Sequence, residues 1–452
     1  MTTTTPVQYR NLVNRAVCVT PTYLRKLKGA RQRKGLLSAD TLPTSWLLVL
    51  MVVFGLHTTM VQGQDTLKIV KQFHKLGPAL NSFLSGLGND AAWATDVAGV
   101  GDIDNDGVPD LASGQNTYNG NRGAIWLMFM NADGTVKDTA LITNGRNGIP
   151  SSMLNIGNGV ADGFGGRVEG IGLLDNDNVP DIAVTASGDD DGGTDRGAVY
   201  ILFMNTDGTV KDTTKISDLK GGFTGTMTGG NNFGGALANM GDVDGDGIQD
   251  LGVGSYLSND GGTARGALWV MLMNRNGTVK GHRKYTSAST NWPGTNPISA
   301  NNAQFGFSAD DLGDIDGDGV RDMAVTARLQ GARGYVYILR MNADGTIKAY
   351  QQLGHQLGGL KTSVSGNGGH FGWSIECVGD LNADGVNDLI AGLRYQDDGY
   401  STAGAAIILY LNSDGTIQHE EVISQTKGTG GSSLGLRASF SYPQPNFSSL
   451  RF

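Results

Sequence analysis

Five short segments of the chain place aspartates at alternate positions around a tight turn. The first, GDIDNDGVPD, carries aspartates at 102, 104, 106 and 110. Carboxylates at loop positions one, three, five and nine, with a backbone carbonyl at seven, would supply the hard oxygen ligands that Ca²⁺ prefers. An EF-hand loop begins in the same way but needs a bidentate Glu at position twelve, where this chain has Ser113. The segment therefore predicts a calcium loop that closes at position nine, just before a strand.

The five loops offer the same set of ligands with informative variation. The second loop has Leu173 at position one and Asn178 at position six, so we expect it to bind most weakly or to be empty. The predicted ligands are Asp102, Asp104, Asp106, Val108, Asp110, Asp175, Asp177, Val179, Asp181, Asp242, Asp244, Asp246, Ile248, Asp250, Asp314, Asp316, Asp318, Val320, Asp322, Asp380, Asn382, Asp384, Val386 and Asp388. Turns rich in Asp and Gly also occur without an ion, but five copies in register favour four to five Ca²⁺ sites.

The loops belong to a longer internal repeat. Their leading glycines stand at 101, 172, 241, 313 and 379. A second motif, such as RGALWVMLMNRNGTVK from Arg265, follows every loop, and Phe-Gly precedes the last four loops at Phe164, Phe233, Phe305 and Phe371. In the first unit, Trp93-Ala94 stands in place of Phe-Gly. Three motifs in fixed order at this period indicate a repeat architecture.

Each repeat reads as four antiparallel strands. A Phe-Gly run leads into the Asp loop, a short apolar run follows it, and a second apolar run turns through NADG or NRNG into TVK. Apolar runs of five to eight residues between glycines favour strands over helices, and a Gly at the turn favours a hairpin. Four-stranded sheets repeated at this length predict an all-β fold, a β-propeller.

These motifs carry a family resemblance. Phe-Gly, an Asp loop and then Gly-Ala resemble the FG-GAP repeat of the integrin alpha-subunit propeller, which also occurs in glycosylphosphatidylinositol-specific phospholipase D. The resemblance covers about residues 64–424, although Ile125, Val199, Leu268 or Ala406 replaces the proline of the family name. It implies calcium loops that hold the blades together on the face away from the main ligand surface.

The resemblance also raises a question of blade number, because such propellers usually have seven blades. Five units are visible, near 90–155, 156–228, 229–298, 299–365 and 366–431. QDTLKI at 64–69 resembles the last strand of a unit, and residues 432–452 resemble a degenerate or truncated sixth unit. Either the N-terminal strand closes a ring of five or six blades, or the repeat array is truncated at its C-terminus.

Composition and charge constrain location and partners. Residues 1–64 have a net charge of +7, and the whole chain has a net charge of −9, so residues 65–452 have a net charge of −16. Such an acidic body disfavours nucleic acid as a partner. The apolar stretch 46–56 is too short to span a bilayer and fits a signal peptide within residues 1–63, or a signal anchor. Secretion or surface display is therefore expected. Asn276 and Asn446 lie in N-glycosylation sequons, which a secreted chain can use.

The residues do not suggest an enzyme. No Ser/His/Asp set, phosphate-binding glycine loop or pair of catalytic acids emerges from the sequence. The resemblance to integrin alpha subunits implies an extracellular calcium-binding propeller that recognises a protein or glycan ligand in cell adhesion. The alternative is a non-catalytic accessory module of a secreted hydrolase, such as a phospholipase D-like enzyme.

Overall fold

The computed structural model describes residues 94–154, 162–364, 370–397 and 403–424. The predicted signal segment, Trp93, the strand at 64–69, the tail 432–452 and Asn446 lie outside these ranges. No helix in the described ranges is long and apolar enough to cross a membrane.

The described residues form five antiparallel sheets of four strands each, which we call blades 1 to 5. The strands are β1 (Val97–Gly101), β2 (Asp110–Gln115), β3 (Ala124–Met130) and β4 (Val136–Thr143) in blade 1; β5 (Phe164–Gly172), β6 (Asp181–Ala186), β7 (Ala198–Met204) and β8 (Val210–Ile216) in blade 2; β9 (Phe233–Gly241), β10 (Asp250–Ser255), β11 (Ala267–Met273) and β12 (Val279–Thr286) in blade 3; β13 (Phe305–Gly313), β14 (Asp322–Ala327), β15 (Tyr335–Met341) and β16 (Ile347–Leu353) in blade 4; and β17 (Phe371–Gly379), β18 (Asp388–Leu393), β19 (Ala405–Leu411) and β20 (Ile417–Ser424) in blade 5. Two short helical turns, α2 (Tyr118–Asn121) and η4 (Gln330–Ala332), lie between the second and third strands of blades 1 and 4.

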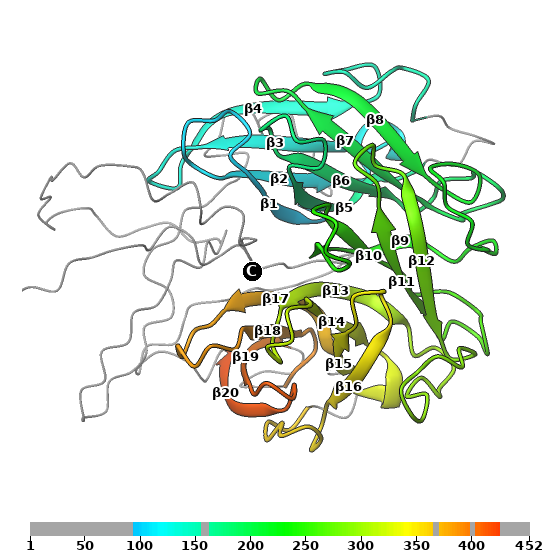
Figure 1. Ribbon diagram of the computed structural model, residues 1–452, viewed down its shortest axis with the longest axis vertical. Helices are drawn as coiled ribbons and strands as arrows, with labels where there is room; N and C mark the ends of the chain where they lie inside the picture. The colour runs from blue at the N-terminus through cyan, green and yellow to red at the C-terminus, as the bar shows by residue number, and fades with distance from the viewer. Residues whose placement is uncertain (1–93, 155–161, 365–369, 398–402, 425–452) are drawn as a thin grey trace, which may run out of the picture.

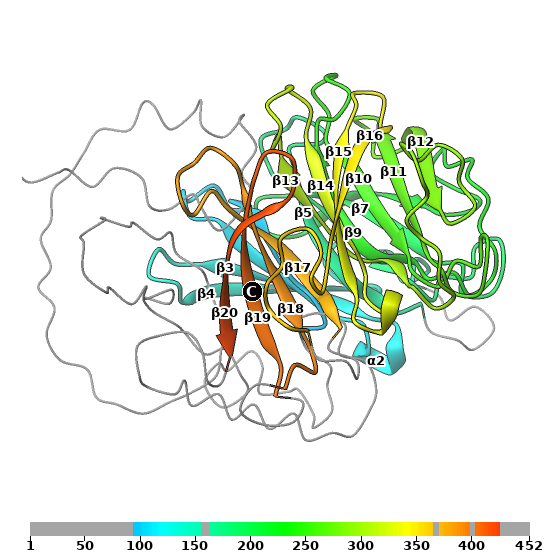
Figure 2. The same ribbon diagram turned by 90° about the horizontal axis from the view of Figure 1, so that it is seen from below.

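The blades are arranged as a five-bladed propeller (Figure 1). Each is a simple meander, and Figure 2 shows β17 to β20 of blade 5 side by side. The first strand of each blade is innermost, and these strands contact one another in the order β1, β5, β9, β13 and β17. No comparable contact joins β17 to β1, although both strands are fully described. The predicted fold class and the assignment of one sheet to each repeat are confirmed.

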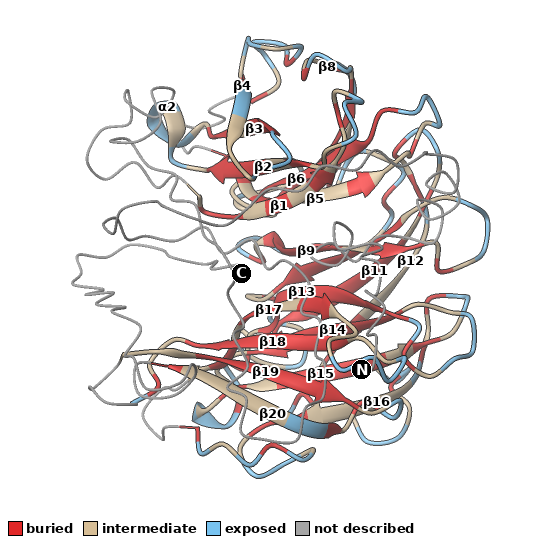
Figure 3. Ribbon diagram, turned by 90° about the vertical axis from the view of Figure 1, so that its left-hand side faces the viewer, coloured by how far each residue is buried: buried red, intermediate tan, exposed pale blue. Residues whose placement is uncertain are grey.

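The hydrophobic core lies between neighbouring blades. The second strands of blades 2 to 5 are buried at every residue, whereas the fourth strands are partly exposed, as the red and pale colours of Figure 3 show. One buried cluster joins blades 1 and 2, another blades 2 and 3, and two more join blade 4 to its neighbours. Strands buried on both faces explain the continuous apolar runs in the sequence, because polar and apolar residues alternate only in strands that have one face exposed to solvent.

The Arg-Gly and Phe-Gly motifs meet at the joints between blades. The backbone N–H of Phe305 at the start of blade 4 donates to the carbonyl of Arg265 in blade 3, at 2.9 Å. Gly266 has a φ of +88°, and a Cβ there would lie 2.1 Å from the carbonyl oxygen of Phe305. Gly123, Gly197 and Gly334 make the same close approach to the next blade's Phe. The glycine therefore permits backbone contact between blades, while the phenylalanine fills the core beneath.

We expect Gly266→Ala to destabilise the protein by about 3 kcal/mol, because the new Cβ adds a backbone clash to the strain of a left-handed conformation. The matched control is Gly294→Ala, which has the same φ of +88° but no atom within 4 Å of the new Cβ. Its free energy of unfolding should fall only by the cost of the left-handed conformation, about 1–2 kcal/mol. Urea unfolding of both variants measures the difference, and equal losses would mean that the joint tolerates a side chain.

Candidate metal centre

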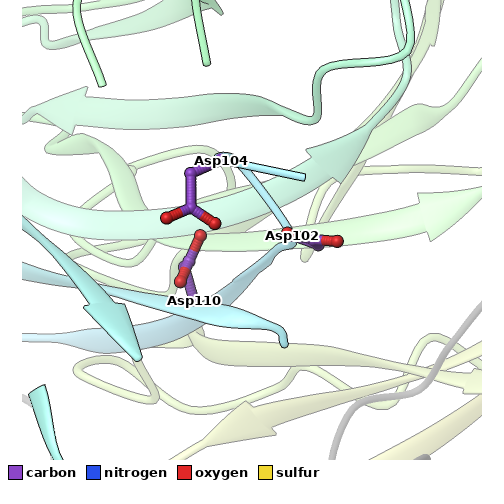
Figure 4. A group of neighbouring side chains, drawn as sticks. All are labelled: Asp102, Asp104 and Asp110. Atoms are coloured by element: carbon purple, nitrogen blue, oxygen red, sulfur yellow. The ribbon is translucent and has the colours of Figure 1, made fainter. Parts of the chain in front are cut away.

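The Asp loops connect the first and second strands of each blade, at one end of the sheets. Three of them bring carboxylates together: Asp102, Asp104 and Asp110; Asp242, Asp244 and Asp246; and Asp314, Asp316 and Asp322. In each group, one oxygen from every residue lies within 4.8 Å of the others. Figure 4 shows Asp104 and Asp110 with their carboxylates close together and Asp102 beside them. Blades 1, 3 and 4 therefore each carry an acidic cluster of a size that could hold a cation.

The residue at position one shapes the turn. In blade 3, Asp242 Oδ1 accepts a hydrogen bond from the backbone N–H of Asp246 at 2.9 Å, and Oδ2 accepts one from Gly247 at 2.8 Å. Asp102, Asp314 and Asp380 accept the corresponding bonds in blades 1, 4 and 5. Leu173 cannot do so in blade 2. That loop has no acidic cluster, although Asp175 and Asp177 are present in the described part of the chain.

The residue at position nine has a structural role beyond the ligand role that the sequence predicts. Asp250 is fully buried; its Oδ2 accepts a hydrogen bond from the backbone N–H of Val243 at 2.9 Å, and its Oδ1 accepts one from Met273 at 2.8 Å. Asp110, Asp181, Asp322 and Asp388 make the same pair of bonds in the other blades. The carboxylate thus joins the loop, the second strand and the end of the third strand, which gives it a structural function even where no cluster forms.

A lysine from the fourth strand binds the outer side of four loops. Lys280 Nζ lies 2.6 Å from Asp244 and also pairs with Asp246. Lys137, Lys211 and Lys348 pair in the same way with the carboxylates at positions three and five of their own blades. In blade 5 the neutral Gln418 takes this position, hydrogen-bonded to Asn382. The recurring Lys of the TVK motif was the available sequence signal, but only the sheet brings it beside the loop.

The inner side of the clusters fits a cation. Asp244 Oδ1 and Asp316 Oδ1 are buried and accept no hydrogen bond from any described residue, although their Oδ2 atoms pair with lysine. A buried carboxylate oxygen without a partner costs free energy, and a metal ion would supply that partner. The side chains of Asp242, Asp244 and Asp246, and of Asp314, Asp316 and Asp322, are those that would hold it.

The pKa values of the position-nine carboxyls lead to a prediction for the protein in chelator. Burial raises the pKa of Asp110 and Asp388 to about 6, and that of Asp181, Asp250 and Asp322 to about 7. Between the unfolded value of about 4 and these values, the folded state holds more protons than the unfolded state, so stability falls as pH rises.

In EDTA, the free energy of unfolding should therefore be higher at pH 5 than at pH 8, as measured by urea unfolding. Calcium should weaken this dependence by favouring the ionised carboxylates. A metal-free protein that gains stability between pH 5 and pH 8 would contradict the assignment.

The predicted glycosylation site at Asn276 lies on the exposed hairpin turn between β11 and β12. Its Oδ1 accepts a hydrogen bond from the Thr278 hydroxyl at 2.7 Å. Asp133, Asp207, Asp344 and Asp414 accept the same bond in the other blades. Asn276 therefore has a structural role in the turn, whether or not it carries a glycan.

Comparison with known proteins agrees with this architecture. A protein-family model described as an FG-GAP-like repeat matches residues 314–391, from the Asp loop of blade 4 to β18. Integrin alpha-3 of Cricetulus griseus is 32% identical over 201 residues, which make up 43% of this chain and 16% of that protein. Integrin alpha-4 of Xenopus laevis is 28% identical over 202 residues, 44% of this chain and 17% of that protein. The chain thus spans about one sixth of the length of these relatives.

Among solved structures, the V. cholerae biofilm matrix protein Bap1 aligns over 73% of this chain and 39% of its own, with a TM-score of 0.31 and 16% identity. The repeat model spans the Asp loops of blades 4 and 5 and the Phe-Gly motif at Phe371. The chain is an FG-GAP repeat β-propeller with distant homology to integrin alpha subunits.

Proposed function

We propose that this protein is an extracellular, calcium-stabilised propeller that recognises another macromolecule, a protein or a glycan, in cell adhesion. The observation that carries the proposal is the homology to integrin alpha subunits, which are cell-surface proteins, in a propeller that holds three acidic clusters. We further propose that the role is one of binding and not of catalysis. The acidic balance of the chain after residue 64 supports a partner other than nucleic acid or an anionic membrane surface.

Calcium is the proposed ion because the cluster side chains offer only oxygen atoms, and a set of several carboxylates suits Ca²⁺ better than the small octahedral Mg²⁺. Blades 1, 3 and 4 are the proposed sites. Each ion would neutralise carboxylates that otherwise repel one another and would link the first and second strands of one blade. Its contribution would thus be to stability, while the loops at the opposite ends of the sheets would contact the partner.

The test is binding of the full chain to glycan arrays and to cell-surface proteins, in calcium and in EDTA. We expect retention on at least one class of ligand in calcium and a weaker signal in EDTA, because removal of the ions loosens the blades. Failure to bind any glycan or cell surface in either buffer would overturn the recognition role.

A further inference from the structure

The end of the propeller opposite the Asp loops carries a cluster of arginines and aromatic rings in blades 3 to 5. Arg328 directly follows β14, and Arg394 directly follows β18. The second strand is six residues long, so these arginines lie roughly 20 Å from the Asp loop of their own blade. Figure 2 shows α2, from the equivalent connection of blade 1, at this edge of the molecule. The cluster is therefore separate from the candidate metal centres.

Both guanidinium groups pack against Trp373 of β17. The Cζ atoms of Arg328 and Arg394 lie 4.3 Å and 4.0 Å from the centre of the Trp373 ring. Arg328 also lies 3.7 Å from the centre of Phe307, and Arg394 lies 4.8 Å from that of Tyr395. Such cation–π contacts hold the two guanidiniums against the rings, and they use none of the five N–H donors that each guanidinium carries.

The two positive charges have no anionic partner in the described part of the chain. Arg328 donates one hydrogen bond, from Nε to the neutral Oε1 of Gln304, and Arg394 makes no hydrogen bond or ion pair with another described residue. Burial and the neighbouring Arg394 and Arg167 lower the pKa of Arg328 to about 10. His370 stacks on Trp373, and its buried Nδ1 has no hydrogen-bond partner among the described residues. Gathered cations without counter-charge are costly, and a bound anion would relieve that cost.

The fold itself does not require these residues. At the position of Trp373, the third of its strand, blades 2 and 3 have Gly166 and Gly235. At the position of Arg328 and Arg394, blades 1 and 2 have Asn116 and Ser187. Those blades form the same four-stranded sheets. Since small or neutral side chains suffice there, the cluster is a local feature of one half of the propeller and calls for an explanation other than packing.

We propose that Arg328 and Arg394, held in place by Trp373, form a binding site for a carboxylate side chain, Asp or Glu, presented by a partner protein. This inference rests on the proposed recognition function and names the chemistry of its ligand. Guanidinium forks bind carboxylates through paired N–H···O bonds, and Trp, Tyr and Arg dominate the centres of protein interfaces. A polyanionic glycan is less suitable, because the chain after residue 64 carries −16 and would repel a dense negative charge.

The test uses the full chain in calcium and an array of short synthetic peptides, each with one Asp or Glu in a neutral sequence, beside the same peptides with Asn or Gln. The wild type should retain acidic peptides and not their amide counterparts. Arg394→Gln and Arg328→Gln should each weaken binding at least about tenfold, while Arg394→Lys, which keeps the charge but not the fork, should lose less. Arg146→Gln is the matched control, because Arg146 is exposed on blade 1, and it should bind as the wild type does.

Arg394→Gln should fold normally, since its guanidinium makes no hydrogen bond to any described residue, and its melting temperature checks this. Equal retention by wild type and Arg394→Gln would overturn the site, as would equal retention of acid and amide peptides. Retention of polygalacturonate but of no acidic peptide would overturn the protein partner. If the wild type and both Gln variants captured a cell-surface ligand equally well, the recognition function would stand and this inference would fail.

Discussion

Asp250→Ala should lower the free energy of unfolding by about 3–5 kcal/mol, even in EDTA. The substitution leaves the buried backbone N–H groups of Val243 and Met273 without their acceptors. Each unsatisfied buried donor costs about 1–3 kcal/mol, and both lie where water cannot replace the lost carboxylate. The effect should be visible in urea unfolding with chelator present, since it does not depend on a bound ion.

Two further variants separate this role from metal binding. Asp246→Ala removes an exposed carboxylate that pairs with Lys280, so it should cost about 1 kcal/mol or less in EDTA. Asp181→Ala, in the loop without an acidic cluster, should cost as much as Asp250→Ala, because its backbone hydrogen bonds are the same. If Asp181→Ala were harmless, the position-nine aspartate would act only as a ligand.

Removal of calcium should produce the other large effect. When the free calcium concentration is about a hundredfold above the Kd of a site, that site adds about 2.7 kcal/mol to the free energy of unfolding. Three such sites would add about 8 kcal/mol. For a domain of this size, EDTA should lower Tm by on the order of 10–15 °C. Calorimetry in calcium, in EDTA and after restoring calcium measures it. An unchanged Tm would mean that calcium does not stabilise this fold.

The lysines provide a sharper test of where the ion binds. Lys280→Gln gives blade 3 the neutral residue that blade 5 has naturally at Gln418, and it removes a positive charge 2.6 Å from Asp244. Calcium titration of this variant should show tighter binding than the wild type, because the ion no longer competes with an ammonium group. Weaker binding would mean that the lysine helps to order the loop.

Phe305 and Gly266 illustrate how far the repeat could be predicted. The period of the repeat, the number of strands in each unit and the positions of the loops can be predicted from the sequence, because each blade is one local meander with the same motifs at its turns. The function of the Arg-Gly motif cannot be predicted from the sequence, since its glycine contacts the Phe of the following blade, about forty residues later in the chain. The sequence does not decide between a closed ring of five or six blades and a truncated array, and the described residues contain five blades.

In the candidate metal centres, the sequence by itself predicted ligands in five loops, because alternate aspartates around a glycine lie within nine residues of one another. Among the described residues, acidic clusters form in the loops of blades 1, 3 and 4, and the fifth loop has none. The sequence also marked the second loop as deficient through Leu173. The tertiary structure alone decided how those carboxylates are used. Asp250 binds the N–H of Met273 and Asp244 meets Lys280, and both contacts join residues more than twenty positions apart. The arginines beside Trp373 likewise follow separate strands, β14 and β18, so only the packing of blade against blade brings them together.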